Sequence, residues 1–170
     1  MKRVLPGLFL TVLLATPCLW AETTINERRG LSADGLIELN LIAGTIKVTG
    51  WQKSEMELTG MLHEDDLKVE ISGGKDRLKI EIVYDNDEDH RNVKGADVEL
   101  RVPRGARVRV ETVSAPITVS EVTERIDLNT VSGNLQVQGS PKEAKLSTVR
   151  GEIVLDDGSS LEMLETNTVS

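Results

Sequence analysis

IELNLIAGTIKV occupies residues 37–48, and IDLNTVSGNLQV occupies residues 126–137. Five of the twelve positions are identical, and most of the others exchange similar residues, such as Glu for Asp or Ile for Val. The second stretch begins 89 residues after the first. A repeat of this length within one chain predicts that both stretches form the same structural unit.

A shorter repeat fills the second half of the chain. Thr-Val-Ser occurs at 112–114, 130–132 and 168–170, and Thr-Val-Arg at 148–150, with spacings of 18, 18 and 20 residues. An apolar-alternating strand pattern follows the copies that begin at 112, 130 and 148. A period near 20 residues with one or two strands per unit is typical of stacked rungs, which bury their apolar faces only against neighbours. We therefore expect residues 37–48 to be another rung of this stack.

The remaining sequence also has strand character, because short runs alternate apolar and polar residues between Gly, Asn, Asp and Ser. Residues from about Gln52 to Val102 predict an inserted meander of antiparallel strands, with loops at Ser72–Lys75 and Asp85–Lys94. The expected fold is all-β: a single-domain, β-solenoid-like stack of short-strand rungs with this meander inserted.

The repeats extend from about residue 108 to residue 170, and the last rung, from Leu161, is incomplete. An unfinished rung exposes an unpaired strand edge. This predicts either a longer protein with further rungs or an edge that pairs with another copy or with a partner strand.

The first 21 residues have the features of a secretion signal. Lys2 and Arg3 precede a short apolar run, and Ala21 is a small residue suited to the position before cleavage. We expect residues 22–170 to be exported to the periplasm or cell surface, with no membrane span after cleavage. Lipoprotein signals place a small residue before the modified cysteine, and Pro17 precedes Cys18 here, which disfavours a lipid anchor.

Charge restricts the partners. The signal holds two basic residues and no acidic one, so the remaining chain carries 18 basic and 28 acidic residues. The resulting net charge near −10 disfavours nucleic acids and anionic membrane surfaces as partners.

Three glycines occupy the same place in the repeat, just before the return strand: Gly44, Gly133 and Gly151. Glycine enters left-handed backbone conformations at little cost, so we expect tight corners at these positions. The unit that begins at Thr112 departs from this pattern, because it continues with Ala115 and Pro116.

The Thr-Val-Ser-Gly corners, Thr49-Gly50-Trp51 after the first rung and Val102-Pro103 before the repeats resemble the bacterial putative-adhesin family of exported β-strand-repeat domains. The resemblance extends from about Leu36 to Ser170. It implies an all-β, solenoid-like fold in the cell envelope, and it brings no catalytic residues with it.

An acidic run offers a candidate metal site, because Asp85, Asp87 and Asp89 alternate like calcium ligands. A helix–loop–helix calcium site needs glycine at its sixth position and glutamate at its twelfth, where this chain has His90 and Ala96. The run therefore favours a solvated hairpin loop, with calcium stabilisation as the alternative. No metal or cofactor is expected.

Trp51 is a further interaction candidate, either as a platform for a sugar ring or as a rim residue that caps the core beside Met56 or Leu58. Sites that stack sugars on aromatic faces usually line up several rings. After the signal the chain has only Trp51 and Tyr84, which favours the rim.

Catalytic signatures are absent from the sequence. The repeated serines lie in no Gly-x-Ser-x-Gly motif, and the two histidines, His63 and His90, show no metal-binding spacing. The repeated serines and threonines are instead predicted to form hydroxyl ladders.

The leading hypothesis is an exported, non-enzymatic scaffold or adhesin-like interaction module of the cell envelope, whose partner is an unidentified envelope protein or polymer. The alternative is an enzyme or binding protein for carbohydrate polymers, using acid pairs such as Asp156 and Asp157 or Glu64 and Asp65. Adjacent strand residues point to opposite faces, so neither pair is arranged for joint catalysis.

Overall fold

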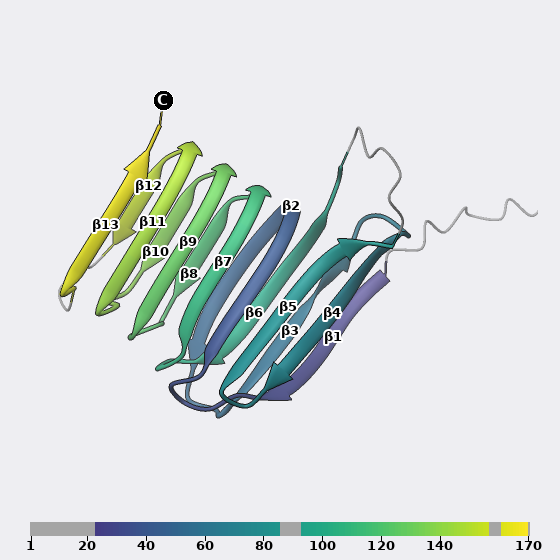
Figure 1. Cartoon of the computed structure of the whole chain (residues 1–170), viewed down its shortest axis with the longest axis horizontal. Helices are drawn as coiled ribbons and strands as arrows, with labels where there is room; N and C mark the ends of the chain where they lie inside the picture. Colours follow the sequence, from purple (N-terminus) through teal and green to yellow (C-terminus); the bar gives the residue numbers. More distant parts are fainter. Residues whose placement is uncertain (1–22, 86–92, 157–160, 170) are drawn as a thin grey trace, which may run out of the picture.

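The structure is a computed structural model that describes residues 23–85, 93–156 and 161–169. Within these ranges every regular element is a strand. The strands are β1 (Thr23–Gly30), β2 (Leu36–Trp51), β3 (Glu55–Leu62), β4 (Leu67–Gly74), β5 (Arg77–Tyr84), β6 (Ala96–Pro103), β7 (Arg107–Ser114), β8 (Ile117–Ser120), β9 (Arg125–Ser132), β10 (Leu135–Gln138), β11 (Glu143–Arg150), β12 (Ile153–Asp156) and β13 (Met163–Thr168). They form one mixed, open sheet system (Figure 1). The expected all-β fold is confirmed, whereas the expected signal and Cys18 lie outside the described residues.

β2 joins the two layers of this system. Its first half, residues 36–43, pairs in parallel with β5 and β7, and its second half, residues 44–51, pairs in parallel with β6 and β8. The chain passes from one layer to the other at Gly44, whose φ is +124°. The sequence predicted two separate strands here, but the backbone keeps its ladder hydrogen bonds through the turn and forms one.

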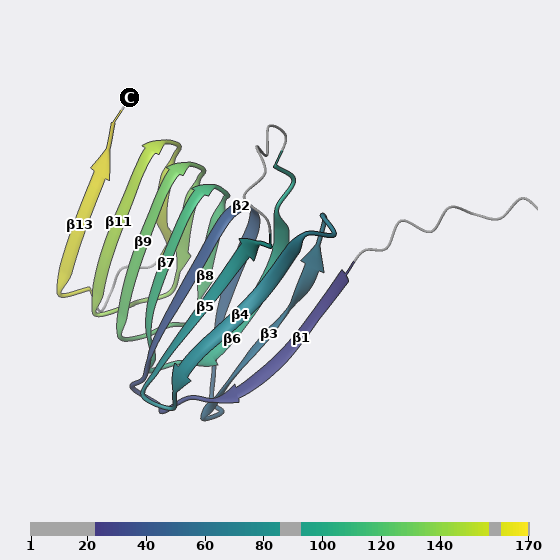
Figure 2. The same cartoon turned by 45° about the vertical axis from the view of Figure 1, so that its right-hand side comes forward.

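The repeats form two parallel ladders. β7, β9, β11 and β13 pair in one layer, and β8, β10 and β12 pair in the other (Figure 2). Ile37 aligns with Val108 and therefore with Ile126. In the other layer, Ile46 aligns with Ile117 and therefore with Leu135. The two copies of the repeated phrase thus occupy equivalent places, two strands apart, in the register of their sequence alignment.

The excursion between residues 52 and 102 is not a simple antiparallel meander, and the prediction is wrong in this respect. β4 and β5 form an antiparallel hairpin, and β3 is antiparallel to β6. However, β5 and β6 both pair in parallel with β2, one in each layer. The parallel register aligns the apolar side chains of β5 with those of β2, such as Ile80 with Leu39, so that both sets are buried together.

β1 is a strand that the sequence did not predict. Ile25 is its only buried residue, so the alternating pattern of a half-buried strand is nearly absent. β1 pairs antiparallel with β3, and Arg28 Nε donates to Glu57 Oε1 at 2.7 Å. Arg101 Nη1 on β6 donates to Glu57 Oε2 at 3.1 Å, so two arginines hold this carboxylate and keep the pKa of Glu57 below its ordinary value.

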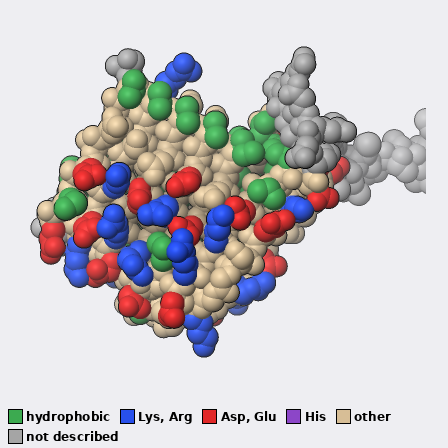
Figure 3. All heavy atoms as spheres, in the orientation of Figure 1, with side chains coloured by type: hydrophobic (Ala, Val, Ile, Leu, Met, Phe, Trp, Pro, Cys, Tyr) green, Lys and Arg blue, Asp and Glu red, His purple; other side chains and the backbone are tan. Residues whose placement is uncertain are grey.

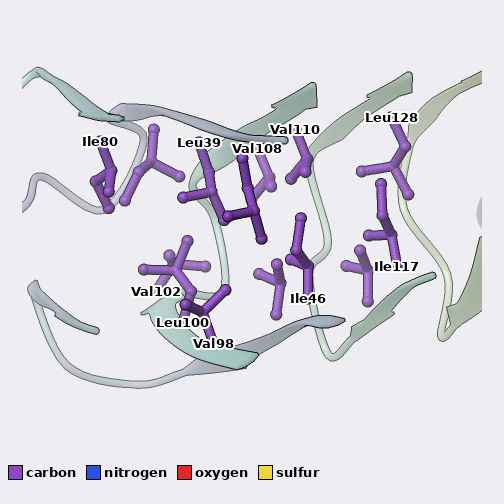
Figure 4. Packing of buried hydrophobic residues seen from close by; sticks show 14 of the residues in the cluster. Leu39, Ile46, Ile80, Val98, Leu100, Val102, Val108, Val110, Ile117 and Leu128 are labelled. Carbon is purple, nitrogen blue, oxygen red and sulfur yellow. The ribbon is translucent and has the colours of Figure 1, made fainter. Parts of the chain in front are cut away.

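The core lies between the two layers and consists of aliphatic side chains (Figure 4). Leu39 and Val110 from one layer face Ile46 and Val98 from the other, and all four are at least 96% buried. Complete burial of such a side chain contributes about 1.5–3 kcal/mol. Burial falls off along the repeats, because β12 is half-buried and every residue of β13 is exposed.

Candidate interaction surface

The repeated glycines lie where one corner approaches the next. A Cβ on Gly44 would lie 1.9 Å from the Ala96 carbonyl oxygen, and one on Gly151 would lie 2.1 Å from the Gly133 oxygen. Gly133 itself does not have a positive φ, so the prediction of a left-handed corner is wrong there. A Cβ on Gly133 would lie 2.2 Å from the Ala115 oxygen. Close backbone contact between neighbouring corners is the constraint at Gly133.

The threonines of the repeat are buried and stacked in register at Thr112, Thr130 and Thr148. The sequence predicted that these hydroxyls bond to one another in a ladder, but the hydrogen bonds that they form go to backbone oxygens. Thr112 Oγ1 donates to the Ile42 oxygen at 3.3 Å, and Thr148 Oγ1 donates to the Gly133 oxygen at 3.2 Å. Thr112 and Thr148 therefore tie neighbouring corners together through the backbone, whereas the buried Thr130 hydroxyl has no hydrogen-bond partner among the described residues.

Trp51 is a half-buried residue at the end of β2. Its Nε1 donates to the Glu55 oxygen at 2.8 Å, and Lys53 Nζ lies 4.5 Å from the centroid of the ring. An ammonium group over the ring face competes with a sugar for that face, so this geometry favours the rim interpretation over the platform.

The acidic run is only partly within the described residues. Asp85 accepts a hydrogen bond of 2.6 Å from Lys68 Nζ, which holds the pKa of Asp85 below its ordinary value. Asp87 and Asp89 lie outside the described residues, as does His90. Among the residues that the structure describes, no three potential ligands cluster as a metal site would require.

Two polar pairs join the ends of β3, β5 and β6. Asp97 Oδ2 lies 3.0 Å from His63 Nε2, and this hydrogen bond holds the pKa of Asp97 below its ordinary value. Tyr84 donates its hydroxyl to Glu64, which also accepts the Lys94 backbone amide at 3.1 Å. Burial, followed by the hydrogen bond to Glu64, raises the pKa of Tyr84 well above its ordinary value. Glu64 is thus engaged in structural contacts.

The outward side of six parallel strands carries the most organised surface. We call it the ladder face: it comprises the outward side chains of β5, of residues 36–42 of β2, and of β7, β9, β11 and β13, with Val169 just beyond β13. Because the strands are in register, equivalent side chains form rows that cross the strands.

One row is an aliphatic ridge, formed by Ile42, Val113, Val131, Val149 and Val169. Their exposed fractions lie between 40% and 57%, and hydrophobic side chains line up along the upper edge of this face (Figure 3). With strands about 4.8 Å apart, five strands give a ridge about 19 Å long. The sequence carries the four Thr-Val units, and the burial of Thr112, Thr130 and Thr148 sets the valine that follows each of them outward.

A second row alternates in charge across the six strands: Lys79, Glu38, Arg109, Asp127, Lys145 and Glu165. Arg109 bridges Glu38 at 3.2 Å and Asp127 at 3.3 Å. Lys145 lies 3.4 Å from Glu165. The Glu38 and Asp127 side chains are only 10% and 12% exposed, so these charges pair along the surface of the sheet.

The ladder face as a whole is electrically balanced. Its acidic side chains are Glu38, Glu81, Glu111, Asp127, Glu143 and Glu165, and its basic side chains are Arg77, Lys79, Arg107, Arg109, Arg125 and Lys145. The complete chain has a net charge of −8. This face is therefore neutral within an acidic protein.

A hollow of about 530 Å³ lies beside the face at the β4–β5 turn. Its lining includes Glu38, Lys75, Arg77 and Lys79, and Arg77 Nη2 lies 2.9 Å from Glu38 Oε2. Among its described residues, the lining holds no group of three potential metal ligands. The arrangement offers apolar contact and paired charges, which suit binding.

The search for similar proteins found matches among solved structures. The chain is similar to a Parabacteroides distasonis protein described as "putative lipid binding protein", with 18% identity and a TM-score of 0.55 over 85% of this chain and 61% of that one. It is similar to a Clostridium sporogenes protein described as a "putative cell adhesion protein", with 7% identity and a TM-score of 0.47 over 86% and 100%. A Parabacteroides distasonis "putative adhesin" has 16% identity and a TM-score of 0.35 over 86% and 67%. At these identities the first likeness shows a shared fold.

No family model matches the sequence, and no curated protein is similar to it.

In the part of the chain that the structure describes, no helix has the length and apolar character needed to cross a bilayer.

Proposed function

We propose that this chain is an exported, non-enzymatic interaction module of the cell envelope, built as a β-solenoid-like stack of rungs. The observation that carries the proposal is the aliphatic ridge. Five β-branched side chains stay exposed in one row, and four of them lie on strands whose other faces form the core. Contiguous exposed apolar surface on a rigid scaffold marks sites of interaction.

The parallel register of β7 to β13 supports the solenoid interpretation, since each unit of 18 to 20 residues adds one strand to the layer that bears the ridge. The adhesin-like interpretation takes its support from the sequence motifs. The partner would be an envelope protein or polymer that presents apolar groups to the ridge.

Export is tested separately from binding. We expect the protein purified from the cell envelope or the medium to begin at Glu22, with residues 1–21 removed. Intact mass measurement decides this, and an uncleaved protein retained in the cytoplasm would contradict it.

Binding is tested by capture from solubilised envelope fractions, using the chain from Glu22 as bait. The variant Val113→Ser/Val131→Ser/Val149→Ser removes the ridge, and Thr118→Ala/Gln136→Ala on the other layer is the control. We expect the wild type and the control to retain one reproducible partner that the ridge variant loses. A partner retained equally by all three would place binding elsewhere, and no partner in any fraction would remove the support for an interaction module.

A further inference from the structure

We propose that two copies of this chain associate face to face through their ladder faces, about a two-fold axis that lies between the two faces and runs along the strands, midway between β7 and β9. The strands of the two copies are then parallel, and their order across the sheet is reversed. The proposal goes beyond an envelope partner, because the occupant of the face is a second copy. It rests on the order of side chains across six strands, which is self-complementary in one register for three of the four rows of the face.

The apolar row supplies the contact. Val83 follows Ile82, which aligns with Leu41, so one further step of the same register places this half-buried side chain beside Ile42 at the end of the ridge. The proposed axis places Val113 opposite Val131 of the second copy and Ile42 opposite Val149 of the second copy. Val83 then faces Val169 of the second copy, so no ridge residue is left without an apolar counterpart.

The charged row fixes the register. Its signs run + − + − + − from Lys79 to Glu165. Reversal about the axis sets Arg109 against Asp127 of the second copy and Glu38 against Lys145 of the second copy. Lys79 meets Glu165 of the second copy, so all the pairs have opposite signs. An axis through a strand would instead bring like charges together, which selects against that alternative.

The row between these two consists of Glu81, Asn40, Glu111, Asn129, Ser147 and Asn167. In the proposed register each of its two glutamates meets an asparagine, so no like charges face each other. The row farthest from the ridge sets Arg107 against Arg125 of the second copy. Both side chains are engaged within their own chain, because Arg107 Nε donates to the Asp34 oxygen and Arg125 pairs with Glu143 at 2.9 Å.

The overall charge also favours this face. Two chains that each carry a net charge near −10 after loss of residues 1–21 repel each other, and the repulsion is weakest where basic and acidic side chains are equal in number. Each side chain of the charged row already has a counterion within its own chain, with Lys79 paired to Glu81, so covering the row leaves none without one. A neutral, self-complementary surface on an acidic chain fits a second copy better than it fits a strongly charged partner.

The test is sedimentation equilibrium of the chain from Glu22, which retains all thirteen strands. Val131→Asp places two carboxylates in the apolar contact, and Lys145→Glu faces Glu38 of the second copy. Their controls are Met61→Asp, an exposed apolar residue on β3, and Lys47→Glu, a lysine on β2 that is paired and exposed like Lys145.

We expect a reversible dimer in the wild type and in both controls. Like charges set against each other cost several kcal/mol, so Val131→Asp should raise the dissociation constant at least about a hundredfold, and the more exposed Lys145→Glu about tenfold. Far-ultraviolet circular dichroism should show that all the variants fold. A wild type that stays monomeric at every accessible concentration overturns the proposal, as does a dimer that both ladder-face variants retain. If that monomer still loses its envelope partner through Val113→Ser/Val131→Ser/Val149→Ser, the ridge binds another protein, and the proposed function stands without self-association.

Discussion

The region up to Pro103 and the repeats from Arg107 onward contribute to the same ladders by different means. The described strands of the first region combine three antiparallel pairings with the parallel pairings of β2, which places β1 and the β4–β5 hairpin at one end of the two layers. The repeats use parallel pairing alone. Among the described strands of the first region, β4 and β1 alone lack a neighbour on one side, whereas burial in the repeats declines toward β13.

This difference indicates how the two regions are stabilised. Repeat units depend on their neighbours, and a stack needs an end that does not repeat. The first region provides such an end. It has a well-buried core, and Arg28 on its edge strand β1 pairs with Glu57 on β3. The repeats should therefore lose stability gradually toward β13, while damage at β2 should affect both regions.

The largest effect is expected at Gly44, where both regions meet. Gly44→Ala combines a φ of +124° with a Cβ only 1.9 Å from the Ala96 oxygen. Strain at positive φ and overpacking together should cost at least about 3–5 kcal/mol, or prevent folding. Gly133→Ala meets only the close contact with Ala115 and should cost about 1–3 kcal/mol.

Gly74→Ala is the matched control, because no atom lies within 4 Å of its added Cβ. Its free energy of unfolding in urea should stay within about 0.5 kcal/mol of the wild type. Equal losses at Gly44 and Gly74 would show that the corner does not constrain the fold.

Because burial declines along the repeats, replacing leucine with alanine should lower the free energy of unfolding more on β9 than on β13. Leu128→Ala on β9 empties a fully buried position and should cost about 2–5 kcal/mol. Leu164→Ala on β13 changes a side chain that is 48% exposed and should cost less than about 1 kcal/mol. Urea unfolding measures both costs from the shift in midpoint, provided that the slope of free energy against urea concentration is unchanged. Similar losses of stability for the two variants would contradict a gradient of stability along the repeats.

Tyr84 offers a probe confined to the first region, since it is the chain's single tyrosine. An unfolded tyrosine ionises near pH 10. The folded pKa of Tyr84 is raised by burial and by Glu64, so its contribution to stability is complete below about pH 10 and is lost as the pH rises further. Phenolate absorbance should therefore appear only with alkaline unfolding. In Glu64→Gln the phenolate absorbance should appear at a lower pH. If Tyr84 ionised near pH 10 in the folded wild type, the pairing with Glu64 would be refuted.

The smallest effect is expected for Asp97, which pairs with His63 at the surface. The folded pKa of Asp97 is lowered, so its contribution to stability is present above its ordinary pKa of about 3.9 and is lost as the pH falls through the folded value. Asp97→Asn should cost less than about 1 kcal/mol at pH 7, because half of the side chain is exposed. The cost measured in urea should shrink toward pH 3, and a loss that grew on acidification would have the wrong sign.

The sequence predicted the strands well where alternation reflects burial on one face, as from Leu78 to Ile82. It could not show whether β5 and β6 run parallel to β2, because a two-residue period carries no direction. β1 was missed because Ile25 is its only buried residue. Gly133 was identified for the wrong reason, since contact between corners appears only once they are stacked.

The ridge was missed for a related reason. A valine between two polar residues can face either side of a strand, and only the burial of Thr112 and its equivalents sets the valines outward. The alternating charge row depends on the register of six strands, of which β5 and β2 lie far from the repeats in sequence. Residue types were readable in the sequence, whereas their juxtaposition required the topology.

The continuity of one ladder across both regions is tested most directly by disulfide trapping. Leu41 aligns with Thr112 and Ala43 with Ser114, so Ile42 lies beside Val113 although 71 residues separate them. Adjacent strands about 4.8 Å apart fall within the range for a disulfide, and strands about 9.6 Å apart do not. In the chain from Glu22, which has no native cysteine, Ile42→Cys/Val113→Cys should form a disulfide within one chain on mild oxidation, as shown by intact mass and by gel mobility before and after reduction. Ile42→Cys/Val131→Cys should remain reduced within the chain, and the reverse result would contradict the shared ladder.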